Sequence, residues 1–129
     1  INDSKATSFD AAQHSLKNNI NIFWIVGGLP KLNDRFKLQN VKKNIIKSYI
    51  VGSNINYFKK QIRGVLEYKS SFTIENALRH IIKDLNLLKQ KQATIILSPA
   101  SASYDQFQNF ADRGNHFKNL TFKYARKFL

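Results

Sequence analysis

Two short polar segments carry residue types that could bind an anionic ligand. The first alternates an acceptor, a cation and a hydroxyl at Asp3, Lys5 and Thr7, which suits a nucleotide ribose beside a charged substrate. The second places Lys31 shortly after a pair of glycines. A lysine ammonium is a point charge for a carboxylate or phosphate, and glycine lets the backbone approach a ligand closely. The alternatives are a polar turn and a solvated lysine.

A third segment, residues 98–104, follows an apolar run with a proline and several small residues. Ser103 and Gln106 have the S-x-x-Q spacing of a capping box, so Ser103 is predicted to cap the final helix. A helix N-terminus presents free N–H groups and favours an anion. The alternative is a plain helix cap with no ligand.

Strands and helices in alternation must position these segments. Short, continuous apolar runs typical of buried parallel strands occur at 21–28, 47–52 and 93–99, with a more polar candidate at 64–69. Helical periodicity predicts helices at 7–18, 54–64 and 73–90, and in the segment after Ser103. Thr7 and Asp10 have the spacing of a capping box for the first helix.

This alternation predicts an α/β fold with a doubly wound, mostly parallel sheet and helices on both faces. In such sheets, ligands bind outside the carboxyl ends of the strands. Residues 3–8, 27–34 and 98–104 fall where strands end or helices begin. We therefore expect these three segments to meet along one edge of the sheet.

The composition predicts one folded domain. The chain has 129 residues, 43% of them hydrophobic, and no apolar run approaches the ~18 residues of a membrane span. It has no cysteine, which excludes disulfides and thiolate metal sites and is compatible with a cytoplasmic location. The three histidines show no metal-ligand spacing, so we expect no metal site. Because no apolar run is long enough to span a membrane, we also expect no membrane partner. Because the chain begins with Ile1 and lacks methionine, we expect it to be part of a longer polypeptide.

The net charge of +13 could attract anions or nucleic acid. The basic residues are scattered, however, with only short clusters such as Lys42-Lys43 and Lys59-Lys60. We therefore expect no dedicated nucleic-acid partner.

Three motifs, in order, resemble one family. They are N-D-S-K-A-T-S at residues 2–8, W-I-V-G-G-L-P-K at 24–31, and L-S-P-A-S-A-S-Y-D-Q-F-Q-N-F-A-D-R-G-N-H-F at 97–117. Together they resemble the C-terminal domain of the Mur ligases, most closely those that add D-glutamate to UDP-N-acetylmuramoyl-L-alanine. Ser8 departs from the asparagine that is usual in the family at that position.

The resemblance implies that residues 1–129 are the Rossmann-like C-terminal domain of a three-domain ligase of peptidoglycan precursor synthesis. In that family ATP and Mg²⁺ bind mainly to the central domain, and the UDP-sugar substrate binds to the N-terminal one. ATP phosphorylates the substrate carboxylate, and the amine of D-glutamate attacks the acyl phosphate. The C-terminal domain supplies much of the amino-acid pocket, so this chain alone is expected to be inactive.

The resemblance also assigns D-glutamate contacts by motif position. Thr7 and Lys31 would hold one carboxylate. Ser103, with the backbone around Tyr104 and Phe110, would hold the other.

Two further residues are assigned to the nucleotide side of the site. Asp3 would contact the ribose, and Lys5 would lie near the phosphates or the reacting carboxylate. The resemblance places no catalytic residue and no metal ligand in this chain. The competing hypothesis is a basic, non-catalytic nucleotide- or nucleic-acid-binding module on a Rossmann-like scaffold, whose binding would weaken steeply with salt.

Overall fold

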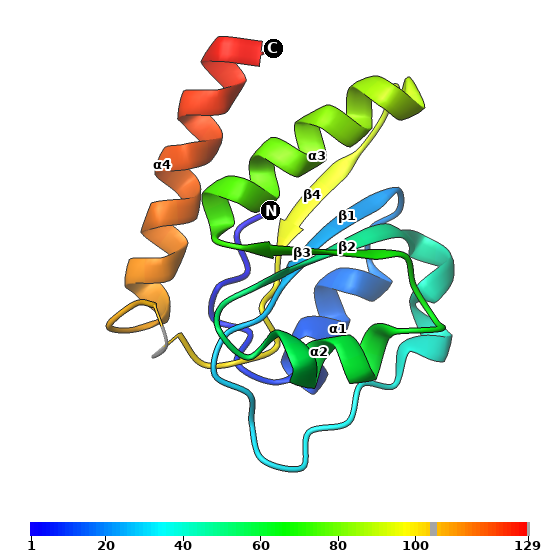
Figure 1. Ribbon diagram of the computed structural model, residues 1–129, viewed down its shortest axis with the longest axis vertical. Helices are drawn as coiled ribbons and strands as arrows, with labels where there is room; N and C mark the ends of the chain where they lie inside the picture. Colours follow the sequence, from blue (N-terminus) through cyan, green and yellow to red (C-terminus); the bar gives the residue numbers. More distant parts are fainter. Residues whose placement is uncertain (104–105, 129) are drawn as a thin grey trace.

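The computed structural model describes residues 1–103 and 106–128, which form one parallel sheet covered by helices (Figure 1). The strand order is β3-β2-β1-β4, and each neighbouring pair is parallel. The strands are β1 (Ile22–Val26), β2 (Ile45–Val51), β3 (Tyr68–Phe72) and β4 (Thr94–Leu97). The helices are α1 (Phe9–Lys17), α2 (Ile55–Ile62), α3 (Ile74–Leu88) and α4 (Phe110–Phe128), with short 3-10 turns η1 (Leu38–Asn40) and η2 (Lys42–Asn44). The predicted α/β class and parallel sheet are confirmed.

The helices cover both faces of the sheet, as Figure 1 shows. Successive strand side chains point to opposite faces. Trp24 and Val26 of β1 therefore pack with α1 and α2, while Phe23 and Ile25 pack with α3 and α4. All five residues of β1 are buried, which explains why its sequence is a continuous apolar run rather than an alternating one.

The first helix is capped by Ser8, so the prediction that Thr7 caps it is wrong. Ser8 has an extended backbone, and its Oγ accepts a hydrogen bond from the Ala11 N–H at 3.3 Å. The helix begins only at Phe9, the first residue of its buried face. Thr7 therefore lies outside the helix and is exposed.

The final helix begins at Phe110, so Ser103 does not cap it as predicted. Asn109 is the capping residue, because its Oδ1 accepts a hydrogen bond from the Asp112 N–H at 2.8 Å. Ser103 instead begins a turn, because its carbonyl accepts the N–H groups of Gln106 and Phe107. The local S-x-x-Q pattern marks this turn rather than a helix start.

The strand expected at 64–69 forms later in the chain, at Tyr68–Phe72. The N–H groups of Val65 and Leu66 both donate to the Ile62 carbonyl, so the turn that closes α2 continues through these residues. Pairing with β2 starts at Tyr68, opposite Ser48.

Within the described residues, every helix is too short or too polar to cross a lipid bilayer. The same residues contain no group of three or more histidine, aspartate or glutamate side chains close enough to hold a metal ion.

The Ser8 cap gives a first prediction. Ser8→Ala removes the acceptor of the Ala11 N–H and is expected to lower the free energy of unfolding by about 1 kcal/mol. Thr7→Ala, one residue earlier, serves as the control and is expected to change it by less than about 0.5 kcal/mol. Urea unfolding of the two variants measures both values. A larger loss for Thr7→Ala would contradict the cap assignment.

Candidate functional site

The three polar segments meet at the carboxyl edge of the sheet. The Leu29 N–H donates to the Ala102 carbonyl at 2.8 Å, and the Ala102 N–H donates back to the Leu29 carbonyl at 2.9 Å. The Gly27 N–H donates to the Pro99 carbonyl at 3.0 Å. The N-terminal segment joins them, because the Asp3 N–H donates to the Leu97 carbonyl at 2.8 Å. Backbone hydrogen bonds thus hold together segments that are nearly a hundred residues apart in sequence.

A cavity of about 300 Å³ opens where these segments meet. Thr7 and Lys31, which the motifs assign to one carboxylate, both line it. The remaining lining residues are Ser8, Leu29, Pro30 and Ala102. The cavity therefore combines one ammonium and two hydroxyls with a short apolar wall.

The loop that carries Lys31 is fixed by contacts to two helices. Asp34 is the anchor: its carbonyl accepts hydrogen bonds from the Tyr57 hydroxyl and the Gln61 side chain of α2. The Asp34 carboxylate accepts the Phe9 N–H at 2.9 Å, at the N-terminus of α1. The Asp34 N–H donates to the Lys31 carbonyl at 3.1 Å, which closes the turn. The exposed Lys31 side chain thus extends from an ordered backbone turn.

Ser103 lies beside this cavity but does not line it. It is buried, and its neighbour Ala102 contributes to the cavity wall. Tyr104, the next assigned residue, lies outside the described residues. The structure therefore brings the backbone of this turn to the cavity, without placing the Ser103 side chain in its lining.

Lys5 and Phe110 lie in a second hollow, of about 210 Å³, at the start of α4. Phe110 is half exposed, and Lys5 is exposed. The other lining residues are Asn2, Ser4, Ala111, Gly114 and Asn115. The sequence-assigned D-glutamate residues are thus divided, because Phe110 lies with Lys5 rather than with Thr7 and Lys31.

The Asp3 carboxylate connects the N-terminal segment to the sheet and to α1. Its Oδ2 accepts hydrogen bonds from the Ser98 hydroxyl at 2.7 Å and the Ser15 hydroxyl at 2.9 Å. Ser98 is further fixed because its carbonyl accepts the Trp24 indole N–H at 2.7 Å. Asp3 is 9% exposed, so it has a clear structural function at this edge.

Sequence reasoning missed Arg113, a fully buried side chain in the first turns of α4. Its guanidinium donates to the Ser4 hydroxyl at 3.0 Å and to the Ser4 and Ser101 carbonyls, each at 2.8 Å. One signal was available. Arg113 precedes Phe117 by four residues and Leu120 by seven, so it occupies the buried stripe of the helix.

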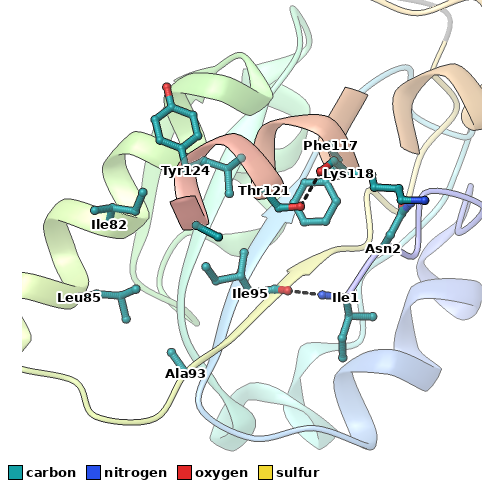
Figure 2. A pocket seen from close by; sticks show the side chains of 12 residues that line it. Ile1, Asn2, Ile82, Leu85, Ala93, Ile95, Phe117, Lys118, Thr121 and Tyr124 are labelled. Carbon is teal, nitrogen blue, oxygen red and sulfur yellow. Dashed lines mark hydrogen bonds between the residues drawn. The ribbon is translucent and has the colours of Figure 1, made fainter. Parts of the chain in front are cut away.

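A larger cavity, of about 550 Å³, lies elsewhere (Figure 2). It is an apolar groove between α3, α4 and the edge strand β4, with Leu78, Ile82 and Phe117 among its lining residues. Ile1 lies at this groove, where its ammonium donates to the Ile95 carbonyl at 2.6 Å. The groove is beside β4, whereas the polar segments converge at the carboxyl ends of the strands.

Several titratable side chains with shifted pKa values lie between α3 and the sheet. Burial and a hydrogen bond to Asp84 raise the pKa of Tyr49. Burial also raises the pKa of Asp84, but hydrogen bonds from Tyr49 and Lys47 outweigh it and lower the pKa overall. Burial lowers the pKa of His80, whose Nδ1 lies 2.8 Å from the Ser71 hydroxyl. These contacts attach α3 to β2 and β3.

Comparison with known proteins identifies relatives along nearly the whole chain. No protein-family model matches it. It is 38% identical over 120 residues to a UDP-N-acetylmuramoylalanine--D-glutamate ligase of Nitrobacter hamburgensis, which covers 93% of this chain and 26% of the relative. A protein of the same name from Phenylobacterium zucineum is 39% identical over 125 residues, covering 97% of this chain and 26% of the relative. The resemblance to the Mur ligases is confirmed. The chain spans about a quarter of the length of these relatives.

The three Mur-ligase motifs correspond to the three segments that the structure joins. The motif at 2–8 supplies Thr7, the motif at 24–31 supplies Lys31, and the motif at 97–117 supplies Ala102 to one cavity. The last motif also contains Arg113, whose guanidinium reaches back to the first.

The backbone of Gly28 gives a second prediction. Its φ is +145°, and a Cβ there would lie 2.4 Å from the Ala102 carbonyl oxygen. Gly28→Ala is expected to lower the free energy of unfolding by roughly 2–4 kcal/mol through backbone strain and this clash. Gly64→Ala is the control, because its φ is +81° but no atom lies within 4 Å of the added Cβ. It is expected to cost about 1 kcal/mol. Equal losses in urea unfolding would contradict the close approach.

Proposed function

We propose that this chain is the C-terminal, amino-acid-binding domain of an ATP-dependent ligase that joins D-glutamate to UDP-N-acetylmuramoyl-L-alanine. The observation that carries the proposal is the 38–39% identity to ligases of that name over more than 90% of the chain. It is supported by the cavity that Thr7 and Lys31 share at the carboxyl edge of the sheet. We place the reaction in the cytoplasm, in the synthesis of peptidoglycan precursors for the cell wall.

In this proposal, Lys31 and Thr7 hold one carboxylate of D-glutamate. The ammonium supplies a charge-assisted hydrogen bond, and the hydroxyl adds a second donor. The anchored backbone of the Lys31 loop favours this role, since the backbone that carries the ammonium loses less conformational entropy on binding. Ser103 and the backbone around Tyr104 and Phe110 are proposed for the other carboxylate, although neither Ser103 nor Phe110 lines the cavity of Thr7 and Lys31 in this structure.

The amine of D-glutamate is then the reacting group. ATP, with Mg²⁺, supplies the activation of the L-alanyl carboxylate as an acyl phosphate. The amine nitrogen bonds to the acyl carbon, the bond from that carbon to the phosphate oxygen breaks, and the amine loses a proton. The contribution of this chain is to orient the amino acid, which is an entropic contribution to the rate.

Asp3 and Lys5 are proposed for the nucleotide side of the reaction. Lys5 lies in the hollow at the start of α4, where an ammonium would face phosphates or the reacting carboxylate. Asp3 would contact the ribose through Oδ1, since Oδ2 already accepts two serine hydroxyls. ATP, Mg²⁺ and the UDP-sugar are proposed to bind mainly to parts of the longer protein outside this chain.

The experiment that tests this function is phosphate release by the full-length protein. The assay contains ATP, Mg²⁺ and UDP-N-acetylmuramoyl-L-alanine, with D-glutamate, L-glutamate, lysine or a diamino acid added in turn. We expect release with D-glutamate alone, because the proposed pocket holds one enantiomer of a dicarboxylate amino acid. Release with another amino acid would keep the ligase and overturn the pocket assignment. No release from folded protein would overturn the proposal and favour the basic binding module.

A further inference from the structure

We infer that Arg113 is a positioning residue that fixes the walls of the amino-acid cavity relative to one another. The inference rests on the proposed function, because it concerns the same cavity. Arg113 itself is not among the residues that line that cavity.

The guanidinium connects α4 to two other segments by hydrogen bonds. Nε donates to the Ser4 hydroxyl at 3.0 Å, and Nη2 donates to the carbonyls of Ser4 and Ser101, both at 2.8 Å. Arg113 is 2% exposed, so water does not compete with these bonds. Hydrogen bonds from a charged donor in such surroundings are among the stronger ones in proteins.

Each segment that Arg113 contacts leads directly into the cavity. Ser4 is three residues before Thr7, and Ser101 is adjacent to Ala102. The segment that follows β1 and leads to Lys31 also lies close to the guanidinium, since a Cβ on Gly28 would lie 3.1 Å from Nη1 of Arg113. One planar group therefore bonds to two of the segments that supply the cavity walls and lies close to the third.

Ser4 extends the same network to the second hollow. Its hydroxyl accepts the bond from Nε of Arg113 and donates to the Phe110 carbonyl at 2.7 Å. Phe110 is the first residue of α4 and lines the hollow that contains Lys5. Movement of the guanidinium would thus displace both hollows together.

An arginine is needed for this arrangement because its donors form a rigid, planar fork. Nε and Nη2 bond to Ser4 and Ser101 at the same time. A lysine carries its donors on one nitrogen at the end of a flexible stem, so it cannot reproduce both directions at once. Arg113→Lys therefore keeps the positive charge but removes the planar fork of donors that bonds to Ser4 and Ser101 together.

The test compares Arg113→Lys with Arg126→Lys in the full-length protein. Arg126 is the matched control, because it is an exposed arginine near the end of the same helix. We expect Arg113→Lys to raise KM for D-glutamate roughly tenfold or more, and Arg126→Lys to leave it within about twofold. Ser4→Ala removes the Nε acceptor, so its effect on KM is expected to be less than additive with that of Arg113→Lys.

A purely structural role would lower the melting temperature of Arg113→Lys and leave KM for D-glutamate unchanged in the folded enzyme. That result would overturn the inference. Additive effects of Ser4→Ala and Arg113→Lys on KM would also overturn it, since the two groups would then act separately.

Amide hydrogen exchange separates this inference from the proposed function. We expect Arg113→Lys to speed exchange at the Gly27, Leu29 and Ala102 amides, while the Tyr49 amide in β2 is unchanged. The exchange measurement can be interpreted even if the wild-type protein releases no phosphate with D-glutamate. Such a lack of phosphate release would overturn only the proposed function. If Arg113→Lys does not fold, Ser4→Ala is measured for the same local change. Exchange that is unchanged, or faster at all four amides, would overturn the inference.

Discussion

A reciprocal pair of hydrogen bonds between Leu29 and Ala102 closes the carboxyl edge of the sheet. The regular pairing of β1 and β4 stops at Ile25 and Leu97. Beyond it, the bond from the Gly27 N–H to the Pro99 carbonyl and this reciprocal pair keep the segments that follow the two strands together. The Lys31 loop and the turn at Ser101 thereby become two sides of one cavity. The relative position of the Lys31 loop and Ala102, which both line the cavity, depends on that closure.

The burial of the sheet on both faces limits where polar chemistry can occur. Helices pack against both sides of β1 and β2, so apolar side chains of these strands fill the two cores, and the polar side chains of Lys47 and Tyr49 are already bonded to Asp84 of α3. Polar groups with freedom to meet a ligand are concentrated where strands end and loops begin. The apolar groove beside β4 is larger, but the proposed dicarboxylate needs hydrogen-bond donors, and the smaller cavity has Thr7, Ser8 and Lys31 in its lining.

The sequence predicted the sheet well because burial leaves a strong local signal. The apolar run that contains Trp24 had to be a strand covered on both sides, and the structure confirms it. Caps were predicted less well, since S-x-x-Q at Ser103 and T-x-x-D at Thr7 are local patterns. The true caps, Asn109 and Ser8, are set by where the chain must turn to bury the next apolar face. Arg113 was missed because its acceptors are mostly backbone carbonyls, which the sequence does not mark.

The measurement that tests the account most directly is the kinetics of Lys31→Ala in the full-length protein, with Lys37→Ala in the same exposed region as control. Loss of the proposed charge-assisted contact to a D-glutamate carboxylate predicts a fall in kcat/KM of about 30- to 1000-fold. Lys37→Ala is expected to change it by less than about twofold. A fall below about threefold for Lys31→Ala would contradict the account, because the Lys31 ammonium, which lines the cavity, would then not bind the substrate.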